Sequence, residues 1–298
     1  MEKEFDICIV GAIGIDTNVY LYSNEVDFEK EANFSENVDN VGQAGGYCSR
    51  IMSYLGYETA FIGYIGDDFQ GQYIKKILEK ENIHTDGLFT DPSGTKRSVN
   101  FMYKDGRRKN FYDGKGSMQV LPDMELCEKI LSKSSVVHFN IPNWARYLLP
   151  LAKKLGMKIS CDIQDAYSLE DMYRKDFIEY SDILFFSGVN FKNPLKTLED
   201  FGKIYKDKII ICSMGKDGCA VYRDEKILRQ NAIESKKSII DTNGAGDSLA
   251  MGFISAYLLE NLDLDKSLKA GQILARHVCS LKNPKTDFIH RKELYKML

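Results

Sequence analysis

Residues 239–248 read IIDTNGAGDS, a stretch that passes from two apolar residues through two glycines into a helical pattern. Small residues at the start of a helix expose backbone N–H groups, and the helix dipole adds positive potential there. The N–H groups of Gly244, Ala245 and Gly246 are therefore predicted to form an anion hole that admits a phosphate. Asp247 follows directly, where a carboxylate can orient and deprotonate an attacking hydroxyl. The alternative is a tight turn in which Asp247 only complements the helix dipole.

The rest of the chain alternates short apolar runs with helical patterns. Strands are expected at residues 7–10, 59–65, 136–139, 157–161, 183–186 and 208–212, and helices at residues 47–55, 69–81, 144–155 and 248–259. Nearly unbroken apolar runs are typical of strands buried on both faces. The pattern predicts an α/β fold, with a mostly parallel β-sheet sandwiched by helices and ligands bound beyond the carboxyl ends of the strands.

Composition restricts the class of protein. The chain has 298 residues, 44% of them hydrophobic, and a net charge of -3, which fits one large α/β domain or two smaller ones and does not suggest a nucleic-acid partner. The N-terminus is expected to form a strand and not a signal peptide, and no apolar run is long enough to cross a membrane. Seven scattered cysteines without metal-type spacing are expected to be reduced thiols of a cytoplasmic protein.

Two polar stretches interrupt this alternation, at residues 18–41 and 95–112. Both contain alternating apolar residues, and the second has a turn signal at residues 104–106. They are predicted to be strands of a separate small sheet. Two hypotheses are equally compatible with the pattern: a lid over the strand ends, or two surface hairpins.

Four motifs, in order along the chain, resemble those of the ribokinase family of PfkB-type carbohydrate kinases. They are GQAGG at residues 42–46, GYIGDDFQG at 63–71, SMGKDG at 213–218 and DTNGAGD at 241–247. The resemblance extends over nearly the whole chain. It implies a single ribokinase-like α/β domain over residues 1–298, with a lid formed by about residues 17–42 and 95–113.

The resemblance also implies roles for individual residues. Asp247 matches the catalytic base, and Gly244, Ala245 and Gly246 match the anion hole. Other matches bind substrate (Asp16, Gly45, Gly46) or ATP (Ser213, Gly215, Gly218, with Gly244 and Gly246). A carboxylate such as Asp16 suits vicinal hydroxyls because it accepts two hydrogen bonds, although a turn residue after the first strand is the alternative.

Two departures from the family pattern limit the substrate assignment. Arg50 stands where the family usually has a sugar-binding asparagine, so it either binds an anionic substrate or is an ordinary solvated helix residue. Residues 187–190 read SGVN where many members have Asn-x-x-Glu, associated with magnesium, so water or Asp241 would take the place of the glutamate. Some fructosamine-type kinases of the family show a similar loss.

These observations predict an ATP- and Mg²⁺-dependent kinase that phosphorylates a hydroxyl of a sugar or sugar derivative, of ketose or fructosamine type among others. The resemblance further implies a homodimer formed through the lid, and it leaves a monovalent-cation requirement open. A nucleoside kinase and a non-catalytic sugar- or nucleotide-sensing protein are the alternatives. Neither a dinucleotide-binding Gly-x-Gly-x-x-Gly after the first strand nor a P-loop occurs in the sequence.

Overall fold

A nine-stranded sheet forms the centre of the protein in the computed structural model, which describes residues 3–104, 107–283 and 285–298. The strand order is β13-β12-β11-β10-β9-β8-β1-β4-β5, and neighbouring strands from β11 to β5 are parallel. The antiparallel strands β12 and β13 extend one edge. In chain order the strands are β1 (Phe5–Val10), β4 (Thr59–Ile65), β5 (His84–Thr90), β8 (Ser134–Phe139), β9 (Lys158–Asp162), β10 (Ile183–Ser187), β11 (Ile209–Ser213), β12 (Cys219–Arg223) and β13 (Lys226–Gln230).

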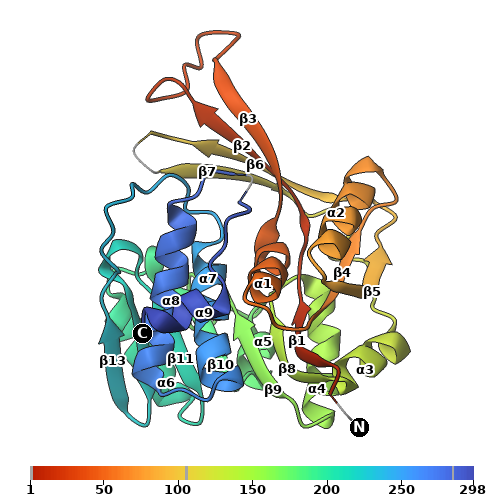
Figure 1. Cartoon of the computed structure of the whole chain (residues 1–298), viewed down its shortest axis with the longest axis vertical. Helices are drawn as coiled ribbons and strands as arrows, with labels where there is room; N and C mark the ends of the chain where they lie inside the picture. Colours follow the sequence, from red (N-terminus) through yellow and green to blue (C-terminus); the bar gives the residue numbers. More distant parts are fainter. Residues whose placement is uncertain (1–2, 105–106, 284) are drawn as a thin grey trace.

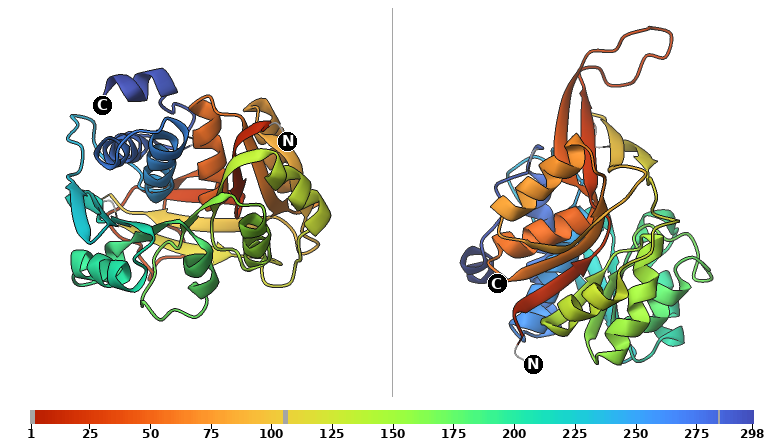
Figure 2. Two further views of the ribbon diagram at one scale, coloured as in Figure 1. Left: turned by 90° about the horizontal axis from the view of Figure 1, so that it is seen from below. Right: turned by 90° about the vertical axis from the view of Figure 1, so that its right-hand side faces the viewer.

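Helices cover both faces of this sheet, as the two views of Figure 2 show. One face carries α1 (Gln43–Tyr54), α2 (Phe69–Lys80), α7 (Ala245–Ile254), α8 (Leu264–Cys279) and α9 (Arg291–Lys296). The other carries α3 (Met124–Ser132), α4 (Leu149–Lys154), α5 (Lys175–Tyr180) and α6 (Pro194–Ile204). The predicted α/β sandwich is confirmed.

Two predicted helices differ in detail from the expectation. The helix expected at residues 144–155 begins as a 3-10 helix, Asn143–Leu148, before α4. The helix expected at residues 248–259 is α7 followed by a π-helical turn, Ser255–Leu259. Two further 3-10 turns, Gly188–Asn190 and Gly215–Asp217, follow β10 and β11.

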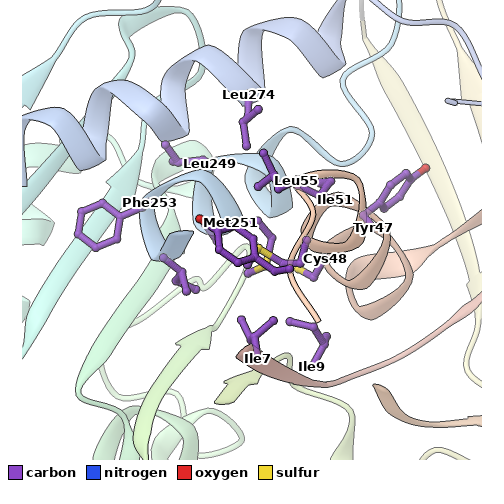
Figure 3. Close-up of a cluster of buried hydrophobic side chains, with 14 of the residues drawn as sticks. Ile7, Ile9, Tyr47, Cys48, Ile51, Leu55, Leu249, Met251, Phe253 and Leu274 are labelled. Carbon is purple, nitrogen blue, oxygen red and sulfur yellow. The ribbon is translucent and has the colours of Figure 1, made fainter. Parts of the chain in front are cut away.

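The core is divided by the sheet into two layers, because successive side chains of a strand point to opposite faces. Ile7 and Ile9 of β1 belong to the layer beneath α1, α7 and α8, whereas Cys8 and Val10 belong to the other layer. Figure 3 shows the first layer, in which Cys48 of α1 lies beside Met251 of α7. Since α1 and α7 each begin at the carboxyl edge of the sheet, this packing fixes their N-termini relative to each other.

The two polar insertions form a second, four-stranded sheet with the order β3-β2-β6-β7. Its strands are β2 (Gly14–Leu21), β3 (Ser35–Gly42), β6 (Lys96–Met102) and β7 (Arg108–Asp113). Each insertion is a hairpin, and the parallel pairing of β2 with β6 joins the two hairpins into one sheet. The turn predicted at residues 104–106 lies partly outside the described residues. Because β1 leads directly into β2, the small sheet lies beyond the carboxyl ends of the large one (Figure 1).

All seven cysteines are free thiols, as expected. Within the described ranges, no helix combines the length and apolar character needed to span a membrane.

Candidate active site

The loop between residues 241 and 247 is shaped by one glycine in the left-handed region. Gly244 has a φ of 77° and is the N-cap of α7. Its carbonyl accepts bonds from the backbone N and the Oγ of Ser248, at 2.9 and 2.7 Å. The Ala245 N–H bonds to Thr242 O at 3.2 Å, so that one of the three predicted donors is engaged within the loop. A Cβ built on Gly246 would meet no atom within 4 Å outside the adjoining backbone, which leaves this side accessible to an anion.

Asp247 lies in the first turn of α7 and is half-buried. Burial raises the pKa of its carboxyl to about 8, and the neighbouring charge of Asp162 adds to the effect. Oδ1 lies 3.7 Å from the Sγ of Cys48, on the N-terminal half of α1. A carboxyl with so raised a pKa has the proton affinity that a general base requires.

Asp16 projects from β2 toward the same region. Its Oδ2 accepts hydrogen bonds from the hydroxyl of Tyr47 at 3.1 Å and from the backbone N of Gln43 at 3.3 Å. Burial raises the pKa of Asp16 to about 6. The residue is therefore a buried strand residue and not part of a turn, and it is close enough to Asp247 for its charge to raise the pKa of that group.

Asp162, at the carboxyl end of β9, is the third carboxyl group of this cluster. Its Oδ1 accepts the backbone N–H of Gln164 at 2.7 Å, and burial raises its pKa to about 6. In the sequence, Asp162 directly follows the strand expected at residues 157–161, but nothing in its spacing distinguishes it from other strand-terminal residues. Its charge raises the pKa of Asp247, which is distant in the chain, so the sequence alone does not connect the two residues.

Gly45 and Gly46 have a clear packing function. Their N–H groups donate to Ala12 O at 2.8 and 3.3 Å, and a Cβ on Gly45 would lie 2.7 Å from that oxygen. Glycine therefore lets the start of α1 approach the loop after β1. The predicted contact of this pair with substrate stays a prediction.

Arg50 differs from both alternatives considered for it. It is only 2% exposed, and its guanidinium forms a bidentate ion pair with Glu81, with both N–O distances 2.7 Å. It also donates to Asn40 Oδ1, Val41 O and Lys285 O. Arg50 is therefore not solvated, and its donors do not point toward the cluster of Asp16 and Asp247. Both alternatives given for it in the sequence analysis are wrong.

The carboxylate of Asp241 is also fully hydrogen-bonded within the protein. Its Oδ2 accepts from Tyr20 Oη and Asn283 Nδ2, each at 2.9 Å, and its Oδ1 accepts from Asn243 N at 2.8 Å. The residue is 1% exposed. This geometry does not fit direct coordination of Mg²⁺, and no group of three or more His, Cys, Asp or Glu side chains suited to a metal occurs in the described part of the chain.

The predicted nucleotide turn joins β11 to β12. Ser213 ends β11, and the turn closes through a bond from Met214 N to Gly218 O at 2.8 Å. Gly215 and Gly218 both have positive φ values, 57° and 89°, and a Cβ on Gly218 would lie 2.1 Å from Gln230 O. The glycines are thus required by the turn, which lies at the same carboxyl edge as β9 and β10.

A ladder of amide side chains crosses the inner face of the small sheet, and sequence reasoning missed it. Asn110 donates to Asn100 at 2.8 Å, Asn100 to Asn18 at 3.0 Å, and Asn243 of the loop before α7 to Asn18 at 3.1 Å. Arg108 of β7 donates to the Oδ1 of Asn243. Period-two alternation could have placed these residues on one face, but only the pairing register brings them into contact.

Comparisons with known proteins agree with this geometry. A family model described as pfkB family carbohydrate kinase matches residues 5–290. The chain is 23% identical to the acarbose 7(IV)-phosphotransferase of Actinoplanes sp. (strain ATCC 31044 / CBS 674.73 / SE50/110), covering 99% of this chain and 98% of that protein. It is 28% identical to the 5-dehydro-2-deoxygluconokinase of Mesomycoplasma hyopneumoniae (strain 232), covering 90% and 85%. The solved structure of a microbiome-derived acarbose kinase, Mak1, has 29% identity, a TM-score of 0.88 and 99% coverage of both chains. The chain belongs to the pfkB family of carbohydrate kinases.

Proposed function

We propose that the protein transfers the terminal phosphoryl group of MgATP to a hydroxyl of a neutral sugar derivative, with Asp247 as the catalytic base. Phosphorylation of a sugar hydroxyl is the activity of its family. The observation that carries the residue assignment is the position of Asp247, one residue beyond Gly246, at the start of α7. A carboxyl of raised pKa there lies beside backbone donors for the transferred group.

In this mechanism the acceptor hydroxyl lies against Asp247, which takes its proton as the oxygen attacks the terminal phosphorus. The N–H groups at the start of α7 bind the oxygens of the phosphoryl group while the bond to ADP breaks. Asp16 accepts hydrogen bonds from other hydroxyls of the sugar and orients it. Magnesium is part of the MgATP substrate and is bound by phosphate oxygens and water. Asp241, which is hydrogen-bonded within the protein, is then not needed as a ligand.

The inner face of the small sheet supports a polyhydroxylated and uncharged acceptor. Alternation along β2 and β6 places Asp16, Asn18, Ser98 and Asn100 on this face. Amide and hydroxyl groups both donate and accept, as sugar hydroxyls do. The whole-length similarity to proteins named for acarbose makes acarbose-like pseudo-oligosaccharides the first acceptors to test.

The small sheet is proposed to act as a lid that excludes water from the reaction, and its outer face is proposed to form a homodimer. Phe101 and Phe111 form an aromatic pair on the outer face, with ring centroids 5.5 Å apart, and Phe111 is 54% exposed. An apolar pair at the edge of an exposed sheet favours association with a second copy. The free cysteines support a cytoplasmic location.

ADP release over a panel of acarbose, 5-dehydro-2-deoxygluconate, fructosamines, simple ketoses and aldoses, and nucleosides tests this proposal. Asp247→Asn is expected to lower turnover about 10²- to 10⁴-fold, the usual contribution of a positioned base. Asp265→Asn is the matched control, because it removes a carboxylate from the first turn of α8, on the surface. Equal turnover by the wild type and Asp247→Asn would refute the assignment, and turnover with nucleosides alone would refute the sugar acceptor.

A further inference from the structure

A buried lysine lies directly beside the anion-hole loop. The side chain of Lys285 is 0% exposed, and its Nζ donates to Asn243 O at 2.5 Å and to Asp241 O at 3.1 Å. A third oxygen, Oδ1 of Asp241, lies 3.8 Å away. Lysine is rarely buried so completely, because removing an ammonium group from water is costly unless oxygen ligands replace its hydration.

These three oxygens belong to Asp241 and Asn243, which precede Gly244 in the loop. Both backbone carbonyls are therefore directed at one point on the side of the loop occupied by Lys285. Carbonyl and carboxylate oxygens in this arrangement are the ligands that hard cations prefer. Lysine supplies a compact positive charge of the same kind, attached covalently to the chain.

The backbone that carries Lys285 is itself anchored. Its carbonyl accepts a bond from Arg50 Nη2 at 3.1 Å, and Arg50 is held by the buried ion pair with Glu81. The helix α1, which carries Arg50, packs against α7. The backbone of Lys285 is thus tied to α1 through the same guanidinium that pairs with Glu81.

The charge of Lys285 also reaches the reacting groups. Burial lowers the pKa of Lys285, while the carboxylates of Asp241 and Asp247 act in the opposite direction. Asp241 is the nearer partner and is satisfied by three further hydrogen bonds. The ammonium group therefore adds positive potential close to the site proposed for the transferred phosphoryl group.

We propose that Lys285 is a positioning residue whose ammonium group acts as a built-in monovalent cation, holding the carbonyls of Asp241 and Asn243 so that the anion hole forms without potassium or another bound monovalent ion. The proposal rests on the proposed function, since it assigns the anion hole to phosphoryl transfer. It answers the question of a monovalent-cation requirement that the sequence left open.

The first test measures turnover of the wild type in choline buffer, with and without added potassium, sodium or ammonium chloride. The expected kcat is the same within about twofold in every salt, because the cation site is filled by the protein. A wild type that needs potassium for activity would overturn the proposal. This test does not require any variant to fold.

The second test compares two substitutions. Lys285→Ala leaves room for an ion, so its kcat is expected to fall on the order of 100-fold in choline and to recover in part with ammonium or potassium. Lys285→Met fills the same space with an apolar side chain and is not expected to recover. Lys208→Met is the control, since Lys208 is also buried and donates to two backbone carbonyls, Glu179 O and Ser181 O, before the amino end of β10.

A readout without turnover separates this proposal from the proposed function. Potassium is expected to raise the melting temperature of Lys285→Ala relative to choline, and to leave those of the wild type and Lys285→Met unchanged. If no acceptor is phosphorylated but this ion-specific shift occurs, the proposed function fails and the cation role of Lys285 stands. An unchanged kcat in Lys285→Ala, or equal salt responses in the Ala and Met variants, would overturn the role of Lys285.

Discussion

The two halves of the segment 239–248 carry one aspartate each, and the two aspartates differ in burial and in hydrogen bonding. Asp241 is 1% exposed, and both of its oxygens accept hydrogen bonds within the protein. Asp247, six residues later, is half-buried beside other carboxyl groups, and its pKa is raised to about 8. The first half is therefore a rigid support, whereas the second half retains polar groups for a ligand. The difference teaches that, within one motif, the carboxyl group suited to catalysis is the partly exposed one, and not the one fully hydrogen-bonded within the protein.

Replacing the aspartate of the rigid half is expected to have the largest effect on stability. Asp241→Asn removes the negative partner of Lys285 and leaves a buried ammonium uncompensated, which typically costs about 3–5 kcal/mol. Urea unfolding at pH 7 measures this loss. If the free energy of unfolding fell by less than about 1 kcal/mol, as for an exposed ion pair, the contrast between the two halves would be wrong.

The junction between the halves is tested by Gly244→Ala. An alanine at φ 77° costs about 1–2 kcal/mol, and its Cβ would lie 2.9 Å from the Tyr47 ring. We expect a kcat reduced on the order of 10- to 100-fold, because the loop must shift.

Gly56→Ala is the matched control for Gly244→Ala. Gly56 has a similar φ of 84°, with nothing within 4 Å of the position of a Cβ. It should lose stability through the backbone alone and keep its kcat. Equal kcat values for the two variants would contradict a catalytic role of the loop.

The second half of the segment, which contains Asp247, is tested by the pH dependence of stability, where the expected effect is smaller. In the unfolded chain Asp247 ionises near 3.8, whereas the folded protein retains the proton up to about 8. The unfolded state therefore binds fewer protons across this range, and the contribution of Asp247 to stability falls as pH rises. Asp247→Asn lacks this cost, so its melting temperature should exceed that of the wild type by a margin that grows from pH 4 to pH 8.

Thermal unfolding of both proteins across this pH range measures the margin. Above pH 8 the margin should stay constant. A margin that is absent at all pH values, or that grows toward acid, would mean that the pKa of Asp247 is not raised in the folded protein. Asp241→Asn provides the contrast, because its melting temperature should lie below that of the wild type at pH 7.

The strands of the large sheet could be predicted from the sequence because their local apolar pattern matches their burial in the folded protein. All six predicted strands correspond to observed strands, since a strand buried on both faces is apolar at most of its positions. The loop of Asp247 was predictable for a related reason, as glycine and the start of a helix are local signals.

The roles that depend on distant partners were not predictable. Arg50 is buried because Glu81 and Lys285 O, 31 and 235 residues away, meet its guanidinium. Lys285 follows no motif, and a lysine is expected to be solvated until the surrounding oxygens are known. Asp162 joined the site through the order of β9 in the sheet, and Asn18 through its pairing register with Asn100.

The central claim is that phosphoryl transfer from ATP to the sugar takes place at the start of α7. A crystal structure with a non-hydrolysable ATP analogue and an accepted sugar tests it most directly. We predict the terminal phosphoryl oxygens within hydrogen-bonding distance of the amides of Gly244 and Gly246, and the acceptor hydroxyl about 2.6–3.2 Å from a carboxylate oxygen of Asp247. A terminal phosphate bound elsewhere, with the acceptor hydroxyl out of reach of Asp247, would contradict it.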